Sequence, residues 1–424
     1  MKMAFLLSVS CSIRRCCSRQ LPAPAAPFAR CASPVSSVVE SSLLTGEAQA
    51  SPSIQTMNPS GFQHPYAARQ QRLKAQFGRK KITALLVTSL PNIYYLTGFR
   101  GSAGVALVGP SESILWVDPR YTLQAAEQAV GVEVIEARRG LLKEAAGWIR
   151  KRRLGRVGYD DAVFTCREFA SLERLAGGGR QWVLAGGMIE DLRIAKDPGE
   201  SDWIRKAGKL TAEVFDEVRN RIRPGASESG LAAEIEYRMK RKGAEGAAFE
   251  TIVASGERSA WPHARPSGKL LKKNDLVIID MGAILGGYAA DMTRTLYLGK
   301  PSARIRRLYN KVREAQERAT QVARAGRLAG DVDAAARKVL ERADLERYFT
   351  HSTGHGVGLE IHEMPRVSRG DKRRLGSGYV ITVEPGVYLE DLGGIRIEDT
   401  VLVTDGKPEV LTPASKDDWY KGQG

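Results

Sequence analysis

The chain has few cysteines where a folded body would use them. Four of the five (Cys11, Cys16, Cys17 and Cys31) lie near the N-terminus, and only Cys166 belongs to the expected folded body. A body with one cysteine holds no internal disulfide, which excludes a disulfide-stapled scaffold and suits a reducing compartment. We therefore predict a cytoplasmic protein.

Long hydrophobic runs are also missing. The apolar runs, such as residues 3–7 and 276–279, are far shorter than the roughly 18 residues that a membrane helix needs. With 43% hydrophobic and 26% charged residues, the 424-residue chain has the composition of a globular protein that is long enough for two domains. We predict no membrane partner.

The charge is unbalanced, with a net value of +16 that favours anionic partners. Lysine and arginine are spread along the chain rather than gathered in blocks, and no DNA- or RNA-binding motif accompanies them. A solvated basic surface explains this charge better than nucleic-acid binding does, so we predict no nucleic-acid partner.

Residues 1–56 do not have the composition of a domain. They are rich in Ser, Ala and Pro, and four arginines precede the first acidic residue, Glu40. This composition is typical of a mitochondrial transit peptide, whereas the apolar run at residues 3–7 is too short for a secretory signal. A start site assigned upstream of the true one at Met57 would produce the same tail. We predict an unstructured extension that is either a targeting segment or not translated, and favour the second explanation.

From residue 57 to residue 191, short apolar strands alternate with helices. Asp118 and Pro119 start one of these helices as cap and first residue. The pattern predicts strands at 82–87, 93–96, 104–108, 113–117, 132–135 and 156–159, and helices at 67–77, 121–129, 141–151 and 165–175. This alternation predicts a small α/β domain over residues 57–191.

The second domain, residues 192–424, opens with a strong helix start. Asp197 is the cap, Pro198 takes the first helical position, and Glu200 completes a capping box. Helices are expected at 198–222, 227–241, 303–325 and 332–343, and mostly strands and turns at 249–298 and 379–411. We expect an α+β domain.

Histidine is rare, and three of the five histidines (His351, His355 and His362) fall within residues 351–363. Glycine and other small residues separate them, so the backbone can approach a ligand closely there. Clustering of a rare metal-binding residue type predicts one wall of a metal-dependent active site.

Two aspartates frame a segment that can form a hairpin. Asp280 ends the apolar run 276–279, and Asp291 begins an alternating strand after a glycine-containing segment. The hairpin would set the two carboxylates side by side, where they repel each other unless a cation lies between them. The alternative is one aspartate in a turn and the other paired with Arg294, and these residues alone favour neither.

Two glutamates repeat this pattern. Glu384 follows the apolar residues 381–383, and Glu398 lies in another apolar strand. Four carboxylates on strands, together with a histidine cluster, suit a pair of divalent ions such as Mn²⁺ or Co²⁺. Two adjacent ions of this kind activate water for hydrolysis.

On these residues the sequence resembles the proline-specific metallopeptidases of the pita-bread (methionine aminopeptidase/creatinase-like) family, Xaa-Pro aminopeptidase and Xaa-Pro dipeptidase (prolidase). Residues 351–363 fit the family signature at every defined position. Residues 192–200 resemble the family's interdomain segment, and residues 92–99 resemble its N-terminal domain. The resemblance implies a creatinase-like α/β N-terminal domain followed by an α+β pita-bread catalytic domain.

The resemblance also implies a metal-ligand set in the family's order: Asp280, Asp291, His355, Glu384 and Glu398. Asp280 would bind one metal ion, Asp291 and Glu398 would bridge both, and His355 and Glu384 would complete the second site. Two divalent ions are implied, with Mn²⁺ favoured over Co²⁺ or Zn²⁺.

Further roles follow from the same resemblance. His263 and His362 would act near the scissile bond, and Glu384 would also accept a proton. His351 and Arg396 would line the substrate pocket.

The implied activity is hydrolysis of the Xaa-Pro bond at the N-terminus of peptides. The family usually assembles as dimers or tetramers, so we expect a homodimer. A dipeptidase is the alternative, because the sequence does not separate it from an aminopeptidase. The metal-free creatinase branch is less favoured, since all five ligands are present. A non-catalytic binding module is favoured only by the basic charge.

Overall fold

The computed structural model describes residues 66–420. The predictions for residues 1–56 therefore lie outside the described residues.

The first domain is built on one six-stranded sheet with the order β4-β3-β2-β1-β5-β6. Strand β2 pairs antiparallel with both β1 and β3, whereas β4, β5 and β6 are added in parallel. Strands β1, β2 and β3 are buried on both faces, which explains their continuous apolar sequences. Their bounds are β1 Ala84–Val87, β2 Gly104–Val108, β3 Ser113–Val117, β4 Glu133–Glu136, β5 Arg156–Tyr159 and β6 Gln181–Leu184. Strand β6 was not predicted.

Seven α-helices belong to the described part of this domain. They are α1 Tyr66–Lys74, α2 Phe77–Lys80, α3 Leu90–Thr97, α4 Thr122–Gln128, α5 Leu141–Lys151, α6 Cys166–Ala176 and α7 Met188–Arg193. The predicted cap is confirmed, because the Asp118 carboxylate accepts a hydrogen bond from the Arg120 backbone at 3.0 Å. A 3-10 turn over Pro119–Tyr121 precedes α4 there. The helix predicted over residues 67–77 is two helices, α1 and α2.

The strand predicted at residues 93–96 is wrong, because these residues lie in α3. A run of four apolar residues does not distinguish a buried strand from a buried helical turn. Pro91 lies in the first turn of the helix, where its fixed φ is favourable, and Ile93, Tyr95 and Leu96 are buried in the core of the domain. The prolyl turn that was expected to separate two strands is therefore a helix start.

The second domain contains four longer helices, α8 Pro198–Val218, α9 Glu228–Arg241, α10 Ala303–Val322 and α11 Ala329–Glu341. The predicted capping box is confirmed, since Asp197 accepts from the Glu200 backbone and Glu200 accepts from the Asp197 backbone, both at 2.9 Å. Ser227 caps α9 through a hydrogen bond from the Gly230 backbone at 3.1 Å. The helix expected to reach residue 222 ends in a 3-10 turn after Val218.

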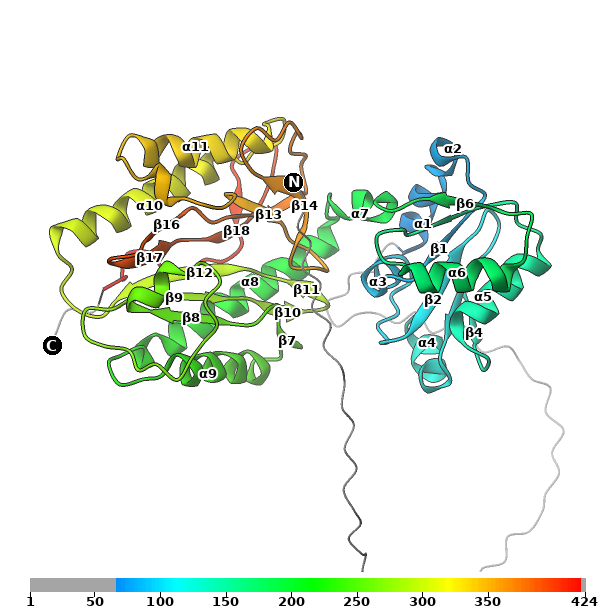
Figure 1. Ribbon diagram of the computed structural model, residues 1–424, viewed down its shortest axis with the longest axis horizontal. Coiled ribbons are helices and arrows are strands. Elements are labelled where there is room, and N and C mark those ends of the chain that lie inside the picture. The colour runs from blue at the N-terminus through cyan, green and yellow to red at the C-terminus, as the bar shows by residue number, and fades with distance from the viewer. Residues whose placement is uncertain (1–65, 421–424) are drawn as a thin grey trace, which may run out of the picture. The chain divides into compact units, whose positions relative to one another are not determined.

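The strands of this domain form several small sheets between the helices. Figure 1 shows α8 and α9 on one side of the strands and α10 and α11 on the other. The sheet orders are β11-β10-β7, β12-β9-β8, β14-β13-β15-β18-β19 and β16-β17. Bounds of the first group are β7 Gly246–Ala247, β8 Ile252–Ser255, β9 Leu276–Met281, β10 Ala283–Leu285, β11 Tyr288–Ala289 and β12 Met292–Tyr297. The others are β13 Gly354–Gly356, β14 Glu363–Val367, β15 Val380–Val383, β16 Gly386–Leu389, β17 Gly393–Arg396, β18 Asp399–Leu402 and β19 Glu409–Val410.

Two large hydrophobic clusters lie in this domain. One gathers side chains of α8, α9, β9 and β12, and the other gathers side chains of α10, α11 and the strands from β15 to β18. Among residues 66–420, no helix combines the length and the hydrophobicity of a membrane span.

Candidate metal centre

The predicted hairpin is confirmed. Strands β9 and β12 pair in antiparallel register with Met281 opposite Met292, so Asp280 and Asp291 lie at the same end of the pair. The chain reverses through β10 and β11, where Gly286 and Gly287 have φ values of 59° and 81° that favour glycine. The alternative pairing of Asp291 with Arg294 does not occur, because Arg294 donates to Asp399 at 2.8 Å.

The other half of the domain supplies the remaining candidate ligands. His355 lies on β13, Glu384 directly follows β15, and Glu398 lies between β17 and β18. The Glu384 backbone donates to Thr353 at 2.8 Å, and the Glu398 backbone donates to Thr293 at 3.1 Å. The second bond fixes Glu398 against β12, and therefore close to Asp291.

These side chains converge on one point. One ligand atom from each of Asp291, His355 and Glu398 lies within 4.8 Å of the other two. His355 Nε2 also lies 3.6 Å from Glu384 Oε1, and 3.7 Å from Asp291 Oδ2. Asp280 Oδ1 and Asp291 Oδ1 are buried and accept no hydrogen bond within the described residues. Buried carboxylate oxygens without donors are costly, and a bound cation removes that cost, so the residues fit a metal site.

The electrostatics of the cluster agree with this fit. Burial, followed by the charges of Glu398 and Asp280, raises the pKa of Asp291 well above its usual range. Burial likewise raises the pKa of Glu398 well above its usual range, and that of Glu384 to about 8. Burial lowers the pKa of His355 to about 4, so its imidazole is neutral and can donate a lone pair to a metal ion.

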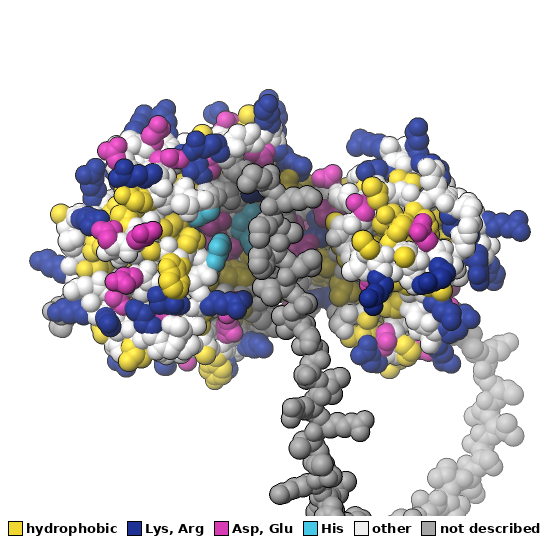
Figure 2. All heavy atoms as spheres, in the orientation of Figure 1, with side chains coloured by type: hydrophobic (Ala, Val, Ile, Leu, Met, Phe, Trp, Pro, Cys, Tyr) yellow, Lys and Arg dark blue, Asp and Glu magenta, His cyan; other side chains and the backbone are white. Residues whose placement is uncertain are grey.

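The cluster lies in a cavity of about 750 Å³. Figure 2 shows histidine and acidic side chains inside this hollow of the surface. Every site residue expected from the sequence lines it: His263, Asp280, Asp291, His351, His355, His362, Glu384, Arg396 and Glu398. The structure therefore brings the whole predicted set together.

Two of these residues are held by their neighbours. Arg396 is only 3% exposed and donates to Asp280 at 2.7 Å, to Tyr388 at 2.9 Å and to Thr293 at 3.0 Å. His351 Nε2 lies 2.9 Å from the Tyr388 hydroxyl. Burial, and then the charge of Arg396, lowers the pKa of His351 to about 4. By contrast, His263 and His362 are exposed to the cavity.

Sequence reasoning missed two polar residues here, Thr293 and Tyr388. The Thr293 hydroxyl accepts from Arg396 and donates to Glu398 at 2.6 Å, while Tyr388 joins Arg396 to His351. The period-two pattern of a strand places Thr293 on the same face as Asp291, so that pattern could have indicated it. Tyr388 carried no comparable signal, because its partners are distant in sequence.

Comparison with known proteins places this geometry in a family. Residues 202–405 match the model of metallopeptidase family M24, and residues 69–195 match that of the creatinase/prolidase N-terminal domain. An Xaa-Pro dipeptidase of Pyrococcus horikoshii is 35% identical over 343 residues, which are 80% of this chain and 95% of that protein.

Solved structures of Xaa-Pro peptidases are similar to this chain over most of its length. An Xaa-Pro dipeptidase from Bacillus anthracis has a TM-score of 0.82 and 34% identity, covering 84% of this chain and 100% of that one. An X-Pro aminopeptidase from Thermotoga maritima has a TM-score of 0.77 and 34% identity, covering 83% and 100%.

The chain therefore belongs to metallopeptidase family M24 and carries the creatinase/prolidase N-terminal domain. The predicted fold, an α/β domain followed by an α+β pita-bread catalytic domain, is confirmed, as is the prediction of a metallopeptidase. Family membership implies divalent metal ions, which the carboxylate and imidazole donors of this cavity suit.

Proposed function

We propose that this protein is a dinuclear metal-dependent aminopeptidase that hydrolyses the Xaa-Pro bond at the N-terminus of peptides. The observation that carries the proposal is the set of four carboxylates and one imidazole at the cavity. Asp280, Asp291 and Glu398 are buried, and two carboxylate oxygens are left without donors. Bound divalent ions would supply an activated water nucleophile at neutral pH and polarise the scissile carbonyl. Mn²⁺ is the favoured ion, with Co²⁺ or Zn²⁺ as alternatives.

The five ligands divide between two ions in this proposal. Asp280 would hold one ion, His355 and Glu384 would hold the other, and Asp291 and Glu398 would be shared by both. The neutral imidazole of His355 and the close approach of Asp291 and Glu398 support this division.

The remaining cavity residues would handle the substrate. Exposed His263 and His362 can donate hydrogen bonds to the peptide around the scissile bond, and Glu384 can accept a proton. His351 and Arg396 line the pocket, and Arg396 also fixes Asp280 through its 2.7 Å hydrogen bond. Because proline lacks a backbone N–H, a site that polarises the carbonyl directly suits this bond.

Turnover by metal-free and metal-loaded enzyme tests the proposal. We expect hydrolysis of Ala-Pro-Ala and Ala-Pro only after Mn²⁺, Co²⁺ or Zn²⁺ is added, and little hydrolysis of Ala-Ala-Ala. Cleavage of Ala-Pro but not of Ala-Pro-Ala would favour the dipeptidase, which similarity to proteins of both names keeps as the second candidate. Cleavage without metal, or none with any metal, would overturn both.

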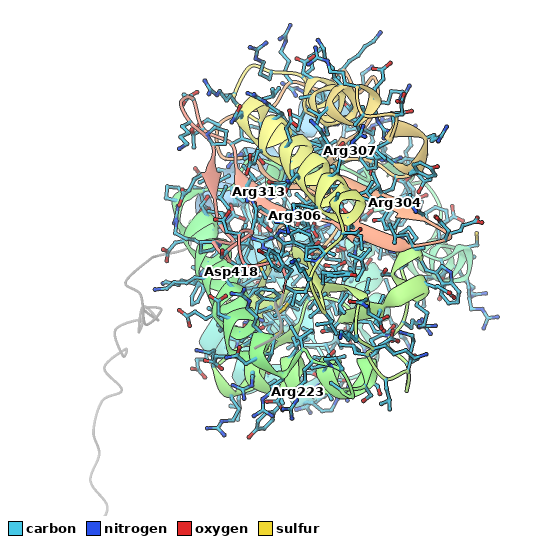
Figure 3. The ribbon with its side chains drawn as sticks, turned by 90° about the vertical axis from the view of Figure 1, so that its left-hand side faces the viewer. Arg223, Arg304, Arg306, Arg307, Arg313 and Asp418 are labelled. Carbon is cyan, nitrogen blue, oxygen red and sulfur yellow. The ribbon has the colours of Figure 1, made fainter. Side chains whose placement is uncertain are left out.

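A binding module remains the non-catalytic alternative, and the basic surface is its only support. Figure 3 shows Arg304, Arg306, Arg307 and Arg313 along α10. Arg304 lies 3.1 Å from Asp391, and Arg313 lies 2.6 Å from Asp417, so acidic side chains already accompany part of this charge. Retarded DNA migration at physiological salt, by protein without bound metal, would favour this alternative.

The proposal also covers the compartment in which the protein acts and its oligomeric state. We propose that it acts in the cytoplasm, in line with the single cysteine of its folded body, Cys166, and that it assembles as a homodimer. Size-exclusion chromatography with light scattering measures the second point directly.

A further inference from the structure

The linker between the two domains, residues 194–197, is fastened to the catalytic domain. The Lys196 backbone donates to Gly378 at 2.8 Å, and Ala195 forms an isolated bridge with Tyr379. These contacts lie just before β15, the strand that leads to Glu384. The linker backbone is thus held beside the strand that leads to the candidate metal centre. These backbone contacts fix the positions from which the linker side chains extend.

Two cations at this point converge on one carboxylate, that of Glu363. Lys196 Nζ lies 2.9 Å from Glu363 Oε2, and the Arg193 guanidinium donates to Oε1. The side chains are 1% exposed for Lys196, 2% for Arg193 and 6% for Glu363. Burial opposes ionisation of Glu363, but the charges of Lys196 and Arg193 outweigh it and lower the pKa to about 2. The carboxylate is therefore ionised at any working pH.

Glu363 also organises the loop that precedes it, residues 357–363. Its Oε1 accepts from the Glu360 backbone at 3.2 Å, and the Glu360 side chain lies 2.7 Å from Arg193. A Cβ added at Gly358 would lie 2.5 Å from Glu363 Oε2, so the loop closes tightly around the carboxylate. The loop backbone thus packs around the buried Glu363 carboxylate, which is paired with Arg193 and Lys196.

His362 immediately precedes Glu363, which we call the anchor of this loop. It is exposed to the cavity, and its ring centroid lies 4.4 Å from that of His355. Within residues 66–420 the His362 ring makes no hydrogen bond that would fix its direction. The position of His362 therefore depends on its backbone, and the adjacent Glu363 determines where that backbone lies.

We propose that Glu363, held by Arg193 and Lys196, is a positioning residue that places His362 against the metal centre. This inference rests on the proposed function, because the histidine that Glu363 positions is one that the proposed function places on the substrate. It gives the interdomain segment a part in turnover, because Arg193 and Lys196 hold Glu363 and Glu363 in turn places His362.

A double-mutant cycle on Mn²⁺-loaded full-length enzyme tests the inference, with Ala-Pro-Ala as substrate and Ala-Pro in its place should only the dipeptide be cleaved. We expect Glu363→Gln to lower kcat about tenfold to a hundredfold, as misplacement of a catalytic group does. KM should change by less than about threefold, because ground-state binding is retained. In a His362→Ala background the same substitution should change kcat by less than about twofold, because the group that it positions is gone. Equal losses in both backgrounds would show a merely structural role and overturn the inference.

Three further measurements keep the result decisive. Glu409→Gln is a matched control, because Glu409 pairs with Arg205 at 2.7 Å away from the cavity, and it should leave kcat unchanged. Lys196→Met removes one cation only, and should reproduce the kcat loss in milder form should Glu363→Gln fold poorly. Hydrogen exchange of peptides covering residues 357–363 should be faster in Glu363→Gln, and unchanged exchange would overturn the anchor itself. A wild-type enzyme without metal-dependent Xaa-Pro cleavage would instead overturn the proposed function, and with it the role in turnover.

Discussion

Asp280 and Asp291 each hold one carboxylate oxygen that is buried and accepts no hydrogen bond within the described residues. Folding leaves few such atoms unsatisfied, because each costs roughly 1–3 kcal/mol or more for a charged group. Their other neighbours are mainly further carboxylates, with the Arg396 guanidinium on Asp280 as an exception. The arrangement is thus poor for the isolated protein and good for one that binds cations. At the scale of single residues, these two carboxylate oxygens are the strongest indication of a metal site.

Asp291→Asn should therefore remove activity without removing the fold. The amide keeps the size of the side chain but cannot bridge two cations as a carboxylate does, so we expect kcat to fall at least about a thousandfold. Elemental analysis of the purified protein should show less metal per chain than in the wild type. Asp405→Asn, at an exposed position, is the matched control and should match the wild type in both measurements. Near-normal turnover by Asp291→Asn would contradict the ligand assignment.

At the scale of elements, the sequence predicted the features that depend on residues close together in the chain, such as helix caps and hairpins. The caps at Asp118 and Asp197 and the hairpin of β9 and β12 were predictable because each depends on neighbouring residues. Helix α3 was misread, because its four apolar residues fit either a buried strand or a buried turn of helix. Tertiary packing, which a local pattern does not contain, decided that case.

The candidate site follows the same division. The convergence of the candidate ligands was predictable because each carboxylate lies in or next to an apolar strand, and the family resemblance supplied the order of these residues. The Thr293 hydroxyl between Arg396 and Glu398, and the pairing of Lys196 with Glu363, were not foreseen. The members of each set come together only when separate elements pack. The period-two pattern of β12 could have placed Thr293 on the face of Asp291, but not its bonds to Arg396 and Glu398.

Strand β13, which carries the candidate ligand His355, packs closely against its neighbour. A Cβ added at Gly354, beside His355, would lie 2.0 Å from the Thr382 carbonyl oxygen. Gly354→Ala should therefore push β13 away from β15, with a loss of about 1–3 kcal/mol in stability, as overpacking of an interior does. Metal affinity should fall with it, because His355 moves.

The matched control is Gly147→Ala in α5, where an added Cβ meets nothing within 4 Å. Alanine is favoured over glycine in a helix by roughly 0.5–1 kcal/mol, so this variant should be as stable as the wild type or more so. Urea unfolding followed by circular dichroism, together with metal titration, measures both variants. Equal effects of the two substitutions would show that β13 tolerates displacement.

At the scale of the whole molecule, the metal centre joins two cores. Ile279 and Met281, on either side of Asp280 on β9, belong to the cluster formed with α8 and α9. Val383 and Ile397, next to Glu384 and Glu398, belong to the cluster formed with α10 and α11. Each side contributes carboxylates to one point between them. Bound ions would therefore act as a cross-link between the two halves of the catalytic domain.

Removal of metal should for this reason loosen the domain as well as stop turnover. A ligand that binds only the folded state stabilises it by about 4 kcal/mol at a thousandfold excess over its Kd, so chelation should lower Tm and restored Mn²⁺ should raise it again. Hydrogen exchange should show where the stability is lost, with the largest increase in peptides from β9, β12, β15 and β18, which flank the ligands, and little change in the first domain. Asp291→Asn supplies the control, because a protein that already binds less metal should show a smaller Tm change on chelation. A chelation effect of equal size in that variant, or exchange that rises evenly through both domains, would contradict a cross-link at this centre.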